Sequence, residues 1–129
     1  LWSGVEGLAS LIPQPELSDG LHAGLAETSL MQHLAPSLVS GSRPVDGLDA
    51  EDPSHQAPSG WSLEGAAPCA WLTSDVSSSG VIGDSRGASA ELGAELETLL
   101  IQHWIQMLQS LVDSDWPPRP MGGRDSSAS

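Results

Sequence analysis

The chain has no lysine, asparagine, phenylalanine or tyrosine, and it has only one cysteine. A lone cysteine, Cys69, cannot form an internal disulfide, which favours a reducing, intracellular location in the cytoplasm or nucleus. Because lysine is absent, only four arginines offset the charge of 17 acidic residues, and the formal net charge is −13. Such a surface repels phosphate groups, which argues against nucleic-acid binding and against binding to anionic membranes. A basic partner, or no partner, fits this charge better.

Large apolar side chains are also scarce. Five tryptophans supply all the aromatic rings apart from histidine, and hydrophobic residues make up 39% of the chain, below the roughly 45–50% usual in globular domains. In their place stand 21 serines, 14 glycines and 10 prolines. Serine and glycine bury little apolar surface, and glycine loses the most backbone entropy on folding. The composition therefore predicts a mostly disordered or irregular chain with a few α-helices, all-α where it is ordered and without a β-sheet.

Periodicity and turn-forming residues divide the chain into four segments. We expect a weakly helical segment at residues 1–39 and a Ser/Gly/Pro-rich acidic linker at 40–88. An amphipathic helix follows at 89–116, and a disordered tail at 117–129. The linker shows no sustained period of 2 or 3.6 residues, and about fifty such residues are too long for a loop inside a compact domain.

The helix at 89–116 is the strongest signal in the sequence. Ser89 is a suitable N-cap, and Pro117 ends the run. Large apolar side chains recur with a helical period and cover about half of the helix circumference. We expect this face to bind a protein partner or a second copy of the chain through Leu96, Leu100, Ile101, Trp104, Ile105, Met107, Leu108, Leu111 and Val112.

Two other interpretations of this helix are a membrane span and a nuclear export signal. Its uncharged run at 98–112 is shorter than the roughly 20 apolar residues of a membrane span, so we expect no membrane insertion. The spacing of Leu92, Leu96, Leu99 and Ile101 resembles leucine-rich nuclear export signals, which enter a hydrophobic groove as a helix. Many amphipathic helices satisfy the same spacing.

The stretch Gly-Asp-Ser-Arg-Gly at 83–87 matches the G-x-S-x-G pattern of serine hydrolases, with Ser85 as the nucleophile. Chance matches are common in a chain so rich in glycine and serine. No histidine follows Asp113 or Asp115, so the usual order of serine, acid and histidine is missing. We therefore predict no enzymatic activity and no catalytic residues.

The four histidines and Cys69 are dispersed, and no pair has the spacing of metal ligands. No phosphate-binding glycine motif is present either. The sequence accordingly predicts no metal and no cofactor. It favours a non-enzymatic acidic interaction protein that docks or self-associates through its C-terminal helix. A small, loosely packed helical structural domain and a recently arisen, unselected reading frame remain as alternatives.

Overall fold

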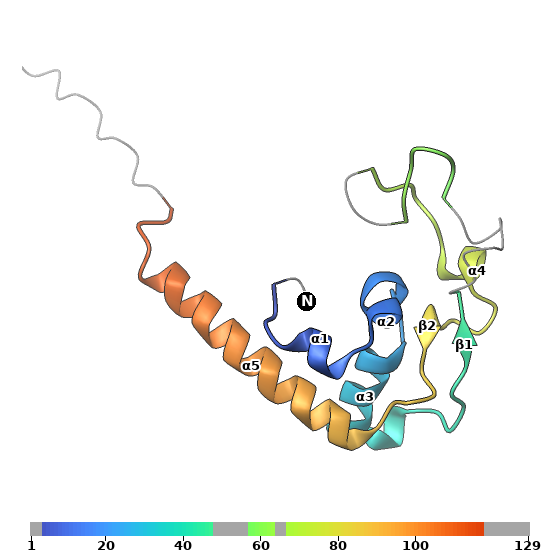
Figure 1. Ribbon diagram of the computed structural model, residues 1–129, viewed down its shortest axis with the longest axis horizontal. Coiled ribbons are helices and arrows are strands. Elements are labelled where there is room, and N and C mark those ends of the chain that lie inside the picture. The colour runs from blue at the N-terminus through green and yellow to red at the C-terminus, as the bar shows by residue number, and fades with distance from the viewer. Residues whose placement is uncertain (1–3, 48–56, 64–66, 118–129) are drawn as a thin grey trace, which may run out of the picture.

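The computed structural model describes residues 4–47, 57–63 and 67–117 (Figure 1). Five α-helices, one 3-10 helix and two short strands lie within these ranges. The elements in chain order are α1 (Leu8–Leu11), α2 (Gln14–Asp19), α3 (Leu25–Leu34), η1 (Pro36–Leu38), β1 (Val45–Asp46), α4 (Thr73–Val76), β2 (Gly83–Asp84) and α5 (Ala90–Val112).

The long helix α5 begins after Ser89, whose Oγ accepts a hydrogen bond from the Leu92 N–H at 3.1 Å. This bond satisfies one of the N–H groups that the first helical turn leaves without a partner. The helix ends at Val112, four residues before the end expected from the sequence. In Figure 1, α1 and α3 lie along the N-terminal part of α5, and its C-terminal part extends beyond them.

α5 and α3 approach each other closely where two small residues meet. Ser29 of α3 is completely buried, and a Cβ atom added to Gly93 of α5 would lie 2.1 Å from the Ser29 carbonyl oxygen. The Ser29 Oγ also accepts a hydrogen bond from the Ser89 N–H at 3.2 Å. The absence of a side chain at Gly93 therefore sets the distance between the two helix backbones.

The hydrophobic core lies between α5 and the N-terminal segment. Its buried members are Val5, Leu8, Ile12, Leu96 and Leu100. Burying a side chain of this size stabilises the fold by about 1.5–3 kcal/mol. The first three turns of α5 are thus held by the chain itself.

The strands β1 and β2 pair in an antiparallel sheet, with Val45 opposite Asp84 and Asp46 opposite Gly83. Asp46 also binds the loop that precedes β2. Its Oδ2 accepts hydrogen bonds from the backbone N–H of Ser78 at 2.9 Å and of Ser79 at 2.8 Å. These bonds, led by those from Ser79, hold the pKa of Asp46 well below its ordinary value.

The prediction of a mostly disordered chain without a β-sheet is wrong. The structure has a two-stranded antiparallel sheet, and β1, α4 and β2 all lie within the segment that was predicted to be a linker. Strands of two residues are too short to produce an alternating pattern, so the sequence carried no sign of them. They are held by hydrogen bonds that distant backbone N–H groups donate to the carboxylates of Asp46 and Glu16, which composition does not reveal. The predicted tail at 117–129 lies outside the described residues except for Pro117.

Within the described residues, no helix is both long enough and apolar enough to cross a membrane.

Candidate functional site

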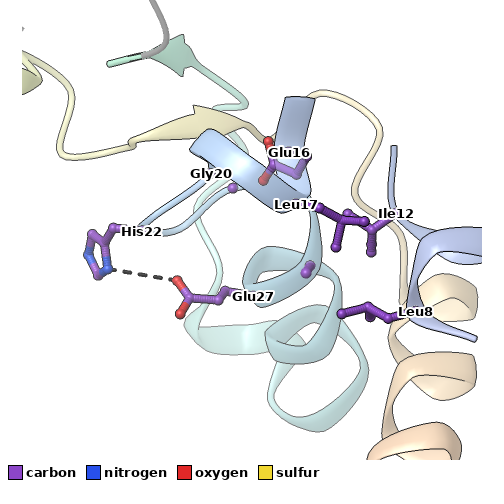
Figure 2. A pocket seen from close by; sticks show the side chains of 9 residues that line it. Leu8, Ile12, Glu16, Leu17, Gly20, His22 and Glu27 are labelled. Carbon is purple, nitrogen blue, oxygen red and sulfur yellow. Dashed lines mark ion pairs between the residues drawn. The ribbon is translucent and has the colours of Figure 1, made fainter. Parts of the chain in front are cut away.

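Two hollows in the surface meet at His22 and Glu27. The smaller one, of about 40 Å³, lies beside α2 and is also lined by Glu16 (Figure 2). The larger one is a cleft of about 670 Å³ that runs along α3. Both hollows include His22 and Glu27 in their walls. These two side chains are therefore the polar groups that face both spaces.

His22 and Glu27 face each other across the start of α3. The His22 Nδ1 atom lies 3.7 Å from the Glu27 Oε2 atom, and the two side chains are 57% and 46% exposed. Figure 2 shows the imidazole and the carboxylate turned toward each other. The pair is close enough for an ion pair when the imidazole is protonated, and it is open enough for water or a ligand to reach it.

The local backbone holds this pair in place. His22 forms an antiparallel bridge with Ile82, in which the Ile82 N–H donates to the His22 carbonyl at 2.8 Å. Ala23 has a left-handed φ of 53°, a strained conformation for a residue with a side chain. Its N–H donates to Glu27 Oε2 at 2.6 Å, which fixes the carboxylate over the first turn of α3.

Glu16 lies behind this pair and is only 7% exposed. Its Oε1 accepts a hydrogen bond from the Leu25 N–H at 2.5 Å, and its Oε2 accepts one from the Asp84 N–H at 2.8 Å. Both oxygens are thus used by backbone donors. Glu16 connects α2 to the start of α3 and to β2, and this connection positions the residues of the site.

The cleft has an apolar side and a polar side. Leu30, Met31, Leu34, Leu38 and Val39 form the apolar side. The polar side includes Ser79, Ser85 and Arg43, the last of these from the segment before β1. Asp46 holds the Ser79 part of this wall through the hydrogen bonds described above.

Ser85 of the Gly-Asp-Ser-Arg-Gly stretch lines the cleft but is not arranged as a nucleophile. It is 2% exposed, and its Oγ donates a hydrogen bond to the Pro44 carbonyl oxygen at 2.7 Å. Within the described residues, no histidine is hydrogen-bonded to it. Its hydroxyl therefore joins the segment after β2 to the segment before β1, and no base that would activate it lies among the residues that the structure describes.

The residues predicted to bind a partner separate into two groups. Leu96 is 0% exposed and Leu100 is 8% exposed, so both belong to the core of the chain. The others remain exposed on the C-terminal part of α5: Ile101, Trp104, Ile105, Met107, Leu108, Leu111 and Val112. The burial of Leu96 also makes the export-like motif inaccessible as a whole. A protein partner or a second copy on the exposed group stays a prediction.

Sequence reasoning missed His22, Glu27 and Glu16 altogether. The sequence shows that a histidine and a glutamate lie five residues apart, but the start of α3 between them was not predicted. Glu16 gave no sign, because its partners are backbone N–H groups nine and 68 positions away. In the described part of the chain, no group of three or more His, Cys, Asp and Glu side chains could hold a metal ion.

Comparison with known proteins gives a family for this chain. The family described as creatininase (creatinine amidohydrolase) matches residues 1–108. No curated protein and no solved structure gives a significant match. The match points to a hydrolase-type enzyme and covers the predicted linker as well as most of α5. The predictions of a non-enzymatic interaction protein, and of no enzymatic activity, are therefore wrong. The interaction-protein prediction failed because a composition rich in serine and glycine does not by itself mean disorder. The prediction of no activity failed because the lack of a serine-hydrolase triad excludes only that one kind of hydrolase. The chain belongs to the creatininase family.

Proposed function

We propose that this chain hydrolyses an amide C–N bond at the junction of the two hollows, with His22 and Glu27 as the reacting pair. The observation that carries the proposal is the placement of these two side chains within the span matched by an amidohydrolase family. They face each other at 3.7 Å, are accessible, and line the cleft that is large enough for a substrate.

The chemistry follows from the properties of the two groups. A neutral imidazole accepts a proton from water as the water oxygen bonds to the amide carbonyl carbon. The same imidazole then gives the proton to the amide nitrogen as the C–N bond breaks, so the products are a carboxylic acid and an amine. The carboxylate of Glu27 on the Nδ1 side orients the ring and stabilises the imidazolium that forms between these steps.

The distance between the two groups is compatible with this role. At 3.7 Å it exceeds an ordinary hydrogen bond, but catalytic hydrogen bonds are often long without substrate and shorten in the complex. The Ala23 N–H already holds the Glu27 oxygen. The exposed imidazole is therefore the group that has to move to shorten this distance.

The family has an α/β metalloenzyme fold, which raises the question whether a metal fits this site. His22 and Glu27 are two suitable ligands, but the nearby Glu16 uses both of its oxygens for backbone N–H groups. The residues that the structure describes therefore do not make up a complete metal centre. The steps given above use only side chains of this chain and water.

The test is a hydrolysis assay with two pairs of variants. Creatinine and simple N-acyl amides are incubated with the wild type, and the release of product is measured by chromatography. His22→Gln is expected to lower kcat by at least about 100-fold, the typical contribution of a general base. Glu27→Gln is expected to lower kcat less, since it orients the base.

A matched control is available in His33 and Glu97. Their Nε2 and Oε2 atoms are hydrogen-bonded at 3.0 Å between α3 and α5, and neither residue lines the two hollows. His33→Gln and Glu97→Gln should keep kcat within about threefold of the wild type. Full activity in His22→Gln, or no hydrolysis of any amide by the wild type, would overturn the proposal.

A further inference from the structure

Arg43 is a cation in the cleft without an acidic partner among the described residues. Its Nη1 donates hydrogen bonds to the carbonyl oxygens of Ser40 and Ser42, the second at 2.8 Å. Arg86, by contrast, has a carboxylate partner: its Nε and Nη2 donate hydrogen bonds to the two oxygens of Asp84 at 3.0 and 2.7 Å. An arginine that lines a cleft and has no carboxylate partner in the described part of the chain is available for an anionic ligand.

The remaining donors of Arg43 suit a carboxylate in particular. Because Nη1 is used by two carbonyl groups, Nε and Nη2 are left, and these are the two atoms that Arg86 uses for Asp84. A planar guanidinium edge binds the two oxygens of a carboxylate by parallel hydrogen bonds. The carbonyl contacts also restrict the Arg43 side chain before a ligand arrives, which lowers the entropy cost of binding.

The apolar side of the cleft indicates the other part of the ligand. Met31, Leu34 and Leu38 are 41%, 58% and 76% exposed, and all three line the cleft. Large side chains left in water at a concave surface are typical of a ligand site, and about 670 Å³ is within the usual range for small molecules. An apolar group of a ligand would cover them.

The charges in the cleft set the direction in which such a ligand lies. Glu27 repels a carboxylate, whereas Arg43 attracts one, and both line the same cleft. A ligand with one carboxylate is thereby oriented with that group at Arg43.

From these observations we infer that the substrate is an N-acyl derivative of an apolar amino acid. Its carboxylate binds Arg43, its apolar side chain lies on Met31, Leu34 and Leu38, and its amide lies at His22 and Glu27. The inference rests on the proposed amide hydrolysis and names the substrate class. Water adds to the acyl carbon, the C–N bond breaks, and the products are the free acid and the amino acid.

The experiment compares two probes that differ in one group. N-acetyl-L-leucine carries the carboxylate, and N-acetyl-L-leucinol has the same amide and side chain with a neutral hydroxymethyl group. Binding of each to the full chain is measured by calorimetry, and hydrolysis by leucine or leucinol release. The wild type is expected to bind the acid about tenfold more tightly than the alcohol, the effect of one charge-assisted hydrogen-bonded pair.

Arg43→Gln should abolish this preference, and Arg43→Lys, which keeps the charge but not the planar edge, should restore only part of it. Arg86→Gln is the matched control, since it removes the same charge outside the cleft, and it should keep the preference. Equal binding of both probes by the wild type, or an unchanged preference in Arg43→Gln, overturns this inference whether or not amides are hydrolysed. An Arg43-dependent preference without hydrolysis overturns the proposed reaction but supports the anionic subsite.

Discussion

The Oε2 atom of Glu16 accepts a hydrogen bond from the backbone N–H of Asp84 at 2.8 Å, across 68 positions of sequence. The other carboxylate oxygen accepts the Leu25 N–H at the start of α3. Glycines surround this carboxylate: a Cβ atom at Gly24 would lie 1.8 Å from Oε1, and one at Gly83 would lie 2.9 Å from it. One buried side chain thus joins α2, α3 and β2, and the site at His22 and Glu27 lies beside this junction.

The first prediction is that Glu16→Gln lowers the free energy of unfolding by about 1–3 kcal/mol. The Gln amide nitrogen would face one of the two backbone N–H donors, and a buried donor without an acceptor costs about that much. The measurement is urea unfolding followed by tryptophan fluorescence. Glu6→Gln is the control, because Glu6 is exposed, and it should change stability by less than about 0.5 kcal/mol. Equal stability of the two variants would show that the Glu16 bonds contribute little.

The second prediction concerns the contact between α3 and α5. Gly93→Ala places a Cβ atom 2.1 Å from the Ser29 carbonyl oxygen and 2.7 Å from the His33 Cβ, so the two helices must separate. Overpacking of this kind costs about 1–3 kcal/mol, although alanine is the better helix former. Thermal unfolding measures the change. Gly41→Ala, with nothing within 4 Å of the added atom, should not be destabilised, and a similar loss in both would contradict the close packing.

The sequence predicted those parts of the fold that depend on neighbouring residues. Ser89 lies three positions before the Leu92 N–H that it caps, and the apolar face of α5 repeats every three to four residues. Such local patterns are visible without a structure. The helical period of the apolar residues could not show where the core ends, because Leu96 and Leu108 occupy equivalent places in that pattern. Leu96 is buried and Leu108 is exposed because only the N-terminal part of α5 packs against the rest of the chain.

The candidate site could not be predicted in the same way. The residues that organise it, Glu16 and Asp46, bind backbone N–H groups of distant segments, and a backbone group carries no sequence signal. The serines at 77–79 suggested a flexible linker, whereas their N–H and hydroxyl groups bind Asp46. Composition predicts disorder when few apolar side chains are buried, but it does not count hydrogen bonds of this kind.

The third prediction is a pH-dependent loss of stability caused by Asp46. Its pKa is held well below the ordinary value of 3.8, mainly by the Ser79 N–H. A carboxyl group with a lowered pKa in the folded state stabilises the fold above the unfolded pKa, and this contribution is lost as the pH falls below it. The difference in urea midpoint between the wild type and Asp46→Asn should therefore be largest at pH 7 and should shrink below about pH 4.

The control for this experiment is Asp19→Asn, at an exposed carboxylate at the end of α2. Its urea midpoint should follow that of the wild type across the same pH range. If the Asp46→Asn midpoint differs from the wild type by the same amount at pH 3 and pH 7, the hydrogen bonds to Ser78 and Ser79 do not depend on the charge of Asp46. The pH dependence would then come from other carboxylates.

The last prediction separates the two ends of α5. Leu96 lies in the core and is 0% exposed, whereas Leu108 is 57% exposed, although both belong to the same apolar face of α5. Leu96→Ala removes buried methyl groups and leaves a cavity, so it should lower the free energy of unfolding by about 2–5 kcal/mol. Leu108→Ala removes groups that already contact water and should change it by less than about 0.5 kcal/mol. Urea unfolding at two protein concentrations measures both variants, and a Leu108→Ala loss as large as that of Leu96→Ala would show that the C-terminal part of α5 is covered in solution.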